Sequence, residues 1–193
     1  KYYIMNRKSV SKKSILVSLF AALICAGCFI SIPLPGGVPV VVQDMLAMLS
    51  GLLLGPVLGS ASVIVFMILG CIGLPVFSGK AGIQVLLNGP TCGFLWGYLA
   101  STFFAGLLLH IFLHPSKEHS NLKQWIVISL VAVLETIILF VLGIIGFRIV
   151  TGADMAKTLA AVVIPFIPGN AIKLVVMILL TKKFRPRIRA FLE

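Results

Sequence analysis

Residues Ile164-Pro-Phe-Ile-Pro-Gly-Asn-Ala-Ile-Lys-Leu-Val-Val-Met177 form an apolar run that contains two prolines and one lysine. An ammonium group in hydrocarbon costs ~2.5–3.5 kcal/mol on insertion scales. Proline breaks a helix, and irregular backbone at membrane depth persists only where protein or a water-filled cavity covers it. The helix break at Pro165–Pro168, followed by Asn170 and a lone Lys173, therefore predicts a site within the membrane.

The composition of the whole chain indicates an integral membrane protein. Of 193 residues, 60% are hydrophobic and 11% are charged, whereas soluble domains carry about 25% charged residues. A helix that spans a bilayer needs ~20 apolar residues, or fewer where it is broken. We therefore expect an all-α fold with six transmembrane helices in one bundle, and a single transmembrane domain over 1–193. The expected spans are Ile15–Ile32, Val41–Leu54, Ser60–Leu74, Thr91–Leu113, Gln124–Phe147 and Thr158–Thr181.

The basic residues predict the orientation of these spans. Twelve of the 16 lysines and arginines flank the termini or lie in the loop between the fourth and fifth spans, and three lie on the other side. Cytoplasmic loops collect lysine and arginine, so both termini are expected to be cytoplasmic. The net charge of +11 then reflects topology and attraction to anionic lipid in the bilayer, and no nucleic-acid partner is expected.

No enzymatic chemistry is apparent in the sequence. Ser78-Gly-Lys-Ala81 is the nearest approach to a phosphate-binding loop, but it lacks the first glycine and the hydroxyl residue that would hold magnesium. No serine or cysteine is placed with a histidine inside a span, and no pair of carboxylates occurs. The four cysteines lack ligand partners at zinc spacing, and the three histidines near His110 fit a solvated loop. We expect no catalytic residue, no metal and no cofactor.

Two carboxylates fall within the expected spans. Asp44 is placed at the outer start of the second span, where an anion stabilises a helix N-terminus, and capping is its simplest interpretation. Glu135 falls at the middle of the fifth span, where a carboxyl group needs a proton, a partner or a cavity. A proton path, a ligand contact and a hydrogen bond to a neighbouring helix are all open for Glu135.

Small residues recur every four positions in three places. Such rows let helix backbones approach closely inside a membrane, and each row could equally pack within the bundle or face a partner subunit. The rows are Ser18, Ala22 and Ala26; Gly51, Gly55 and Gly59; and Gly93, Gly97 and Ser101.

Several motifs, in the same order, resemble those of the BioY family over about residues 14–181. BioY proteins are the biotin-binding S components of energy-coupling-factor (ECF) transporters. The matching segments are Ile32-Pro-Leu-Pro, Pro39-Val-Val-Val-Gln43, Gly51-Leu-Leu-Leu-Gly-Pro-Val-Leu-Gly59, Gly70-Cys-Ile-Gly-Leu-Pro-Val-Phe77, Gly89-Pro-Thr-Cys-Gly-Phe94 and Pro165-Phe-Ile-Pro-Gly-Asn-Ala-Ile-Lys173.

The resemblance implies an ECF S-component-like fold in a bacterial cell membrane, with a biotin pocket near the outer face. It also implies a complex with a transmembrane T component and two ATPase subunits, which would account for the missing phosphate-binding loop. Small residues on the first helix contact the T component in this family, and the row Ser18, Ala22 and Ala26 would match that surface.

The chain departs from the family pattern in its last motif. An aspartate usually precedes the lysine by three residues, and here Asn170 takes its place. Asparagine can still pair with a ureido ring, but without the charge assistance of a carboxylate. Biotin remains the favoured ligand, and an S component for another anionic vitamin-like molecule is the alternative. A stand-alone secondary transporter that uses Glu135 and Lys173 is a further alternative.

A biotin pocket should be mostly apolar with a few placed polar groups. We expect Lys173 to neutralise the ligand carboxylate. Gln43, Gln84, Asn88 and Asn170 are the candidates for bonding to the ureido or carboxylate atoms, and Phe77, Phe94 and Trp96 are the candidate walls around the ring.

Overall fold

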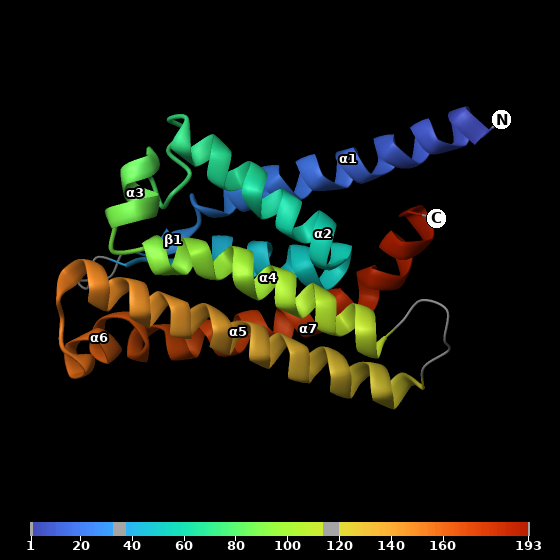
Figure 1. Cartoon of the computed structure of the whole chain (residues 1–193). Helices are drawn as coiled ribbons and strands as arrows, with labels where there is room; N and C mark the ends of the chain where they lie inside the picture. The colour runs from blue at the N-terminus through green and yellow to red at the C-terminus, as the bar shows by residue number, and fades with distance from the viewer. Residues whose placement is uncertain (1, 33–37, 114–119, 193) are drawn as a thin grey trace.

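The computed structural model describes residues 2–32, 38–113 and 120–192, with side chains from residue 10 onward. Within these ranges the chain is mainly helical, with one short strand pair and an irregular loop at 72–82, and five helical stretches are long and apolar enough to cross a membrane (Figure 1). The elements are α1 (Tyr2–Gly27), β1 (Ser31–Ile32), β2 (Val40–Val41), α2 (Gln43–Cys71), α3 (Ile83–Asn88), α4 (Cys92–Phe112), α5 (Asn121–Thr151), α6 (Met155–Val162), the 3-10 turn η1 (Ile164–Phe166) and α7 (Ile167–Leu192).

Helix α2 contains both the second and the third expected span, because the chain reverses within it at Gly55. Gly55 has φ +85° and ψ −176°, a backbone conformation that only glycine adopts without strain. The Ser50 hydroxyl donates to the Gly59 carbonyl at 3.3 Å, whereas residues nine apart in a straight helix lie about 13 Å apart along the axis. The two halves of α2 are therefore an antiparallel helical hairpin, which reconciles five continuous stretches with six transmembrane segments.

The proline-rich segment breaks the last membrane stretch, as its sequence predicts. Helix α6 ends at Val162, η1 carries Pro165, and α7 begins at Ile167 with Pro168 as its second residue. Val163, between α6 and η1, has the non-helical angles φ −120° and ψ −61°. The break therefore places Phe166 in the interior at one end of the bundle, while Ile167 at the start of α7 is exposed.

Helix α4 is the centre of the bundle and packs against α2 on one side and α5 on the other. Glycines make both contacts close. A Cβ on Gly106 would lie 2.5 Å from the backbone nitrogen of Pro56, and a Cβ on Gly146 would lie 2.5 Å from the Cα of Gly93. Backbones that approach this closely gain the dispersion contacts that replace a hydrophobic driving force in lipid.

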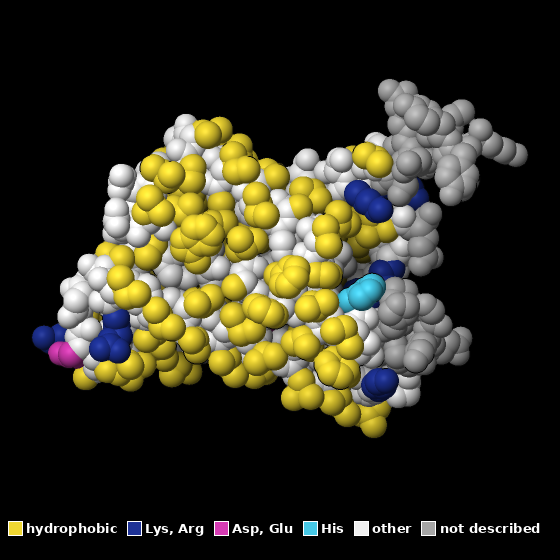
Figure 2. Space-filling view, viewed as in Figure 1, with side chains coloured by type: hydrophobic (Ala, Val, Ile, Leu, Met, Phe, Trp, Pro, Cys, Tyr) yellow, Lys and Arg dark blue, Asp and Glu magenta, His cyan; other side chains and the backbone are white. Residues whose placement is uncertain are grey.

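The two ends of the bundle differ. Figure 1 shows both chain termini at one end, and β1, α3 and α6 at the other. Strands β1 and β2 pair antiparallel, with Ser31 opposite Val41. In Figure 2, apolar side chains cover the middle of the visible face and lysine and arginine side chains lie towards its two ends. An apolar belt between charged ends is the surface of a protein that crosses the bilayer several times.

Candidate functional site

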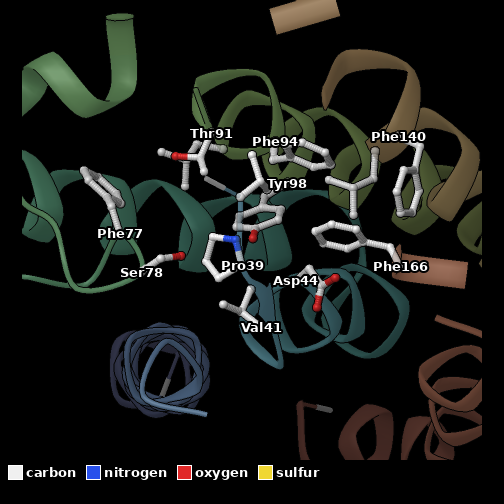
Figure 3. Close-up of a pocket in the computed structure, with 13 residues that line it drawn as sticks. Pro39, Val41, Asp44, Phe77, Ser78, Thr91, Phe94, Tyr98, Phe140 and Phe166 are labelled. Atoms are coloured by element: carbon white, nitrogen blue, oxygen red, sulfur yellow. The ribbon is translucent and has the colours of Figure 1, made fainter. Parts of the chain in front are cut away.

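A cavity lies near the end of the bundle that carries α3 and α6 (Figure 3). Its empty space is ≈ 450 Å³ when the open solvent at its mouth is counted. Its walls come from β2, the starts of α2 and α4, the loop after α2, the middle of α5, and η1. The lining residues are Val38, Pro39, Val41, Asp44, Phe77, Ser78, Thr91, Phe94, Leu95, Tyr98, Leu139, Phe140 and Phe166.

One side of the cavity is a cluster of three phenylalanines. Phe94 and Phe166 stack with their ring centroids 6.3 Å apart and an interplanar angle of 11°. The edge of Phe140 meets both rings, at 6.0 Å from Phe94 and 6.1 Å from Phe166. Offset and edge-to-face packing of this kind stabilises aromatic pairs and gives a rigid apolar wall.

A buried ion pair lies beside this apolar wall. Lys173 Nζ donates to both carboxylate oxygens of Asp44 at 2.8 Å and to the Val41 carbonyl at 2.6 Å. Only 10% of the Lys173 side chain and 8% of the Asp44 side chain are exposed. The interpretation of Lys173 as a lone cation was therefore wrong, because Asp44 balances its charge. Asp44 does not act as a simple N-cap either, since Val42 holds that position without a side-chain cap.

Two distant segments bring the pair together. Asp44 is in the first turn of α2, directly after β2, and Lys173 is in the second turn of α7 on the same buried face as Met177 and Thr181. A charge count narrows the choice, since Lys173 is the only lysine or arginine inside the expected spans and Asp44 and Glu135 are the only acids there. A buried lysine requires such a partner because an unpaired charge in a low-dielectric interior is costly.

Gln43 precedes Asp44 but serves the scaffold. Its side-chain amide donates to the Ile24 carbonyl at 3.0 Å and to the Val76 carbonyl at 2.8 Å, so it ties α1 and the loop after α2 to the start of α2. Its carbonyl oxygen is buried without a hydrogen-bond partner among the described residues, and Gln43 does not line the cavity. A ligand contact by Gln43 stays a prediction.

Gln84 and Asn88 lie together on α3 and away from the cavity wall. The Asn88 amide donates to Gln84 Oε1 at 3.0 Å, and both residues are exposed. The structure thus brings these two candidates together with each other, and not with Lys173. Their role in ligand binding also stays a prediction.

Asn170 is one helical turn before Lys173 on α7. Its amide nitrogen is buried and, in the described part of the chain, has no hydrogen-bond partner. The adjacent Gly169 lies close to β2, with its Cβ position 3.6 Å from a Val40 methyl group. Asn170 therefore holds an unused donor beside the strand that leads into Asp44, but it does not line the cavity, and its ligand contact stays a prediction.

The aromatic candidates separate into two groups. Phe77 and Phe94 line the cavity, as expected for ring-binding walls. Trp96 does not line it: the indole is 46% exposed and its nitrogen donates to the Leu86 carbonyl at 3.2 Å. Sequence analysis missed Tyr98 and Phe140, since a periodic aromatic in a span looks the same whether it faces lipid or a cavity.

Glu135 lies on the face of α5 that carries Leu139, one turn farther from the cavity end. It is 1% exposed, and among the described residues neither of its carboxyl oxygens has a hydrogen-bond partner. Leu139 lines the cavity and Glu135 does not. A direct ligand contact by Glu135 is therefore not supported by this geometry.

The small residues of α1 face outward. Ser18, Ala22 and Ala26 are all exposed, while Phe20, Ala21 and Ile24 form the buried face of the same helix. This row does not pack within the bundle. Its contact with a partner subunit stays a prediction.

The BioY family matches residues 5–190 of the chain. The chain is 37% identical over 183 residues to the Biotin transporter BioY of Rhodobacter capsulatus, a match that covers 89% of this chain and 93% of that protein. It is 35% identical over 175 residues to the Biotin transporter BioY of Thermotoga maritima, with 90% of this chain and 96% of that protein covered.

The fold is similar to a crystal structure of the S-component for biotin from an ECF-type ABC transporter. The TM-score is 0.79 at 27% sequence identity, and the match covers 91% of this chain and 92% of the solved one. The overall fold of the chain is thus a known one.

Proposed function

Because the chain belongs to the BioY family, we propose that it is the biotin-binding S component of an ECF transporter in a bacterial cell membrane. The family consists of membrane transport proteins, so the chain is a multi-pass membrane transport protein and is not an enzyme. Biotin as its own ligand, and the remaining subunits of the transporter, are inferred from its relatives and from the chemistry of the cavity.

The aromatic cavity with its buried ion pair is the observation that carries the proposal. Biotin has a flat fused-ring head with polar ureido atoms and an aliphatic acid tail. The stacked wall of Phe94 and Phe166 suits the flat head, and the Asp44–Lys173 pair supplies polar groups at one edge. Mostly apolar walls with a few placed polar groups are what small-molecule sites provide.

The orientation in the membrane follows from the charges at the two ends. Lys12, Lys182 and Arg189 are among the basic residues near the termini, and Figure 1 shows both termini at the end of the bundle opposite α3 and α6. With both termini cytoplasmic, the cavity faces outward and can capture a vitamin before uptake. A green fluorescent protein fused to the C-terminus should fluoresce in cells, and a periplasmic reporter at that site should stay inactive. The reverse pattern would contradict the orientation.

We attribute the energy for uptake to a T component and two ATPase subunits. The chain has no phosphate-binding loop, and α1 presents an exposed face of small residues on which a partner helix could pack closely. Co-expression with candidate T and ATPase subunits should yield one complex that takes up biotin in proteoliposomes with ATP inside. Uptake by this chain alone would instead support a secondary transporter.

Calorimetry on the purified chain in nanodiscs tests the ligand directly. We expect saturable binding of biotin, and much weaker binding of lipoate, which has an acid tail but no ureido ring. If lipoate binds better than biotin, the chain is an S component for another anionic vitamin-like molecule. That second candidate is motivated by Asn170, which replaces the family aspartate.

The Asn170→Asp variant sharpens this choice of ligand. A new carboxylate would accept hydrogen bonds from ureido N–H groups with charge assistance, but it would also compete for Lys173 one turn away. The two effects oppose each other, so we expect biotin affinity to change by less than about 1.5 kcal/mol. Asn170→Leu should cost more, because a ligand group would then be desolvated without a partner.

A further inference from the structure

The two members of the buried ion pair face the cavity differently. Asp44 belongs to the cavity wall, among the residues drawn in Figure 3, whereas Lys173 does not line the cavity. Lys173 reaches Asp44 from α7 and is not among the residues that line the cavity. The acid is therefore the member of the pair that a ligand would meet first.

The hydrogen-bonding capacity of Lys173 is already used within the protein. An ammonium group has three N–H donors and no acceptor. Lys173 Nζ has three acceptors within 2.8 Å, namely the Val41 carbonyl and the two Asp44 oxygens. In this arrangement it keeps no free donor for a ligand carboxylate.

Asp44, in contrast, keeps spare capacity. A carboxylate has about four acceptor positions on its two oxygens. Oδ1 accepts from Lys173 and from the Met45 backbone N–H at 2.6 Å, while Oδ2 has Lys173 as its hydrogen-bond donor among the described residues. An acceptor position thus remains on Oδ2, in a side chain that lines the cavity. The group it would bind is an N–H donor and not a second anion.

We propose that Asp44 is the residue that recognises the N–H donors of the ligand head, and that Lys173 is a positioning residue that balances and orients Asp44. The inference rests on the proposed function, since it deepens the recognition of a ureido ring at that same site. The pair is neutral as a whole, so the acid tail of the ligand gains little from it and points toward the mouth of the cavity. Affinity then depends on the ring and not on neutralisation of the tail by Lys173.

The residue at position 170 explains why Lys173 in this chain depends on Asp44 for its charge balance. The residue is an asparagine, so α7 brings a cation but no acid to the site. Asp44 supplies from α2 the negative charge that a lysine in this interior requires. The acid at position 44 therefore takes over the charge balance that an acid one turn before Lys173 would otherwise provide.

The decisive experiment compares biotin with biotinamide, which has the same ring and an uncharged tail. Dissociation constants are measured in nanodiscs for the wild type and for Lys173→Gln. If Lys173 acts only through Asp44, Lys173→Gln raises the dissociation constants of biotin and biotinamide by the same factor, within about twofold, because the contact to the shared ring is what the substitution disturbs. If the affinity for biotin falls and the affinity for biotinamide does not, Lys173 binds the ligand carboxylate and the proposal is overturned.

Asp44→Asn tests the acid itself. Loss of a hydrogen bond to a charged group predicts affinities about tenfold to a hundredfold lower for both ligands. Asp44→Asn leaves Lys173 unbalanced and could unfold the protein, so the double variant Asp44→Asn/Lys173→Gln keeps the test valid in a neutral pair. It should also bind biotin at least tenfold more weakly than the wild type, and unchanged affinity in the double variant would overturn the proposal.

A matched control is Asp154→Asn, which removes an exposed acid that caps α6 and pairs with Lys157 at 3.5 Å. Its biotin affinity should equal that of the wild type. The failure of the broader function is distinguishable: if the wild type itself binds neither biotin nor biotinamide, the ligand assignment is wrong. If the wild type binds both and the Asp44 variants bind equally well, only the role of Asp44 is wrong.

Discussion

Two rows of small residues differ in this protein: one is exposed on the surface of the bundle, and the other lies inside it. Ser18, Ala22 and Ala26 on α1 are exposed, whereas Gly51 and Gly59 meet inside the α2 hairpin, with the Cβ position of Gly59 2.8 Å from the Cα of Gly51. All recur every four residues, so their sequence patterns are the same. The difference lies in what covers each face.

The comparison separates residues that hold the bundle together from residues that it leaves available. Gly51, Gly59, Gly93, Gly106 and Gly146 are small because a neighbouring backbone occupies the space where a side chain would be. The small residues of α1 have no such neighbour among the described residues, although a membrane-facing helix has no need of small side chains. An exposed small-residue face within a bilayer is suited to another helix.

The largest effect is expected for Gly93→Leu. A Cβ at this position would lie 2.9 Å from the Gly146 Cα on α5, so a leucine must push two helices apart. Overpacking in a well-packed core typically costs 1–3 kcal/mol, and more where backbone is the obstacle. We expect little monodisperse protein on size-exclusion chromatography after detergent extraction. Ala22→Leu on the exposed row is the matched control and should elute as the wild type does.

Ala22→Trp should leave the isolated protein intact and remove its partners. The thermal midpoint should stay close to that of the wild type, and the dissociation constant for biotin should stay within about twofold of it, because Ala22 is exposed and does not line the cavity. Co-purification with the T component and uptake should be lost, because a bulky side chain blocks close helix approach. Val133→Trp, at a 41% exposed site on α5, should still assemble. Normal uptake by Ala22→Trp would move the docking surface elsewhere.

Gly55→Ala probes a glycine of the α2 row that is required for its backbone and not for its contacts. No atom lies within 4 Å of its Cβ position, but its φ is +85°. A non-glycine residue in a sparsely populated backbone region costs about 1–3 kcal/mol. The thermal midpoint in detergent should fall measurably while biotin binding persists. An unchanged midpoint would mean that the hairpin turn relaxes at no cost.

Ser50→Ala is expected to have the smallest effect. The Ser50 hydroxyl donates to the Ala47 carbonyl at 2.6 Å and across the hairpin to the Gly59 carbonyl at 3.3 Å. Side-chain hydrogen bonds between membrane helices contribute about 0.6 kcal/mol on average. Ser18→Ala, an exposed serine on α1, is the matched control, and a double-mutant comparison should assign the whole loss of stability to Ser50.

Much of the fold could be read from the sequence because its causes are local. Membrane crossing depends on the apolar content of each segment, since a spanning helix must satisfy its own backbone groups. The reversal at Gly55 and the break at Pro165–Pro168 follow from the backbone properties of glycine and proline. The first span was predicted too far, since α1 ends at Gly27 and Ser31–Ile32 form a strand.

The candidate site was less accessible to sequence reasoning because its contacts join distant segments. Lys173 and Asn170 stood out locally, beside a helix break. The ion pair between Asp44 and Lys173 joins residues 129 apart in the chain, and the hydrogen bonds of Gln43 to the Ile24 and Val76 carbonyls join residues 19 and 33 apart. No periodicity distinguishes a glutamine that serves the scaffold from one that faces a ligand.

By itself, the sequence determined that this is a multi-pass helical membrane protein, where its helices reverse or break, and which family its motifs resemble. These properties depend on hydropathy, backbone freedom and residue order, which are written along the chain. Only the tertiary structure decided that Asp44 balances Lys173, that Asp44 and not Lys173 lines the cavity, and that the α1 row is exposed while Gly51, Gly59 and Gly93 lie against neighbouring backbone. Those outcomes depend on which faces meet in the packed bundle, and a face becomes a contact only when a distant helix covers it.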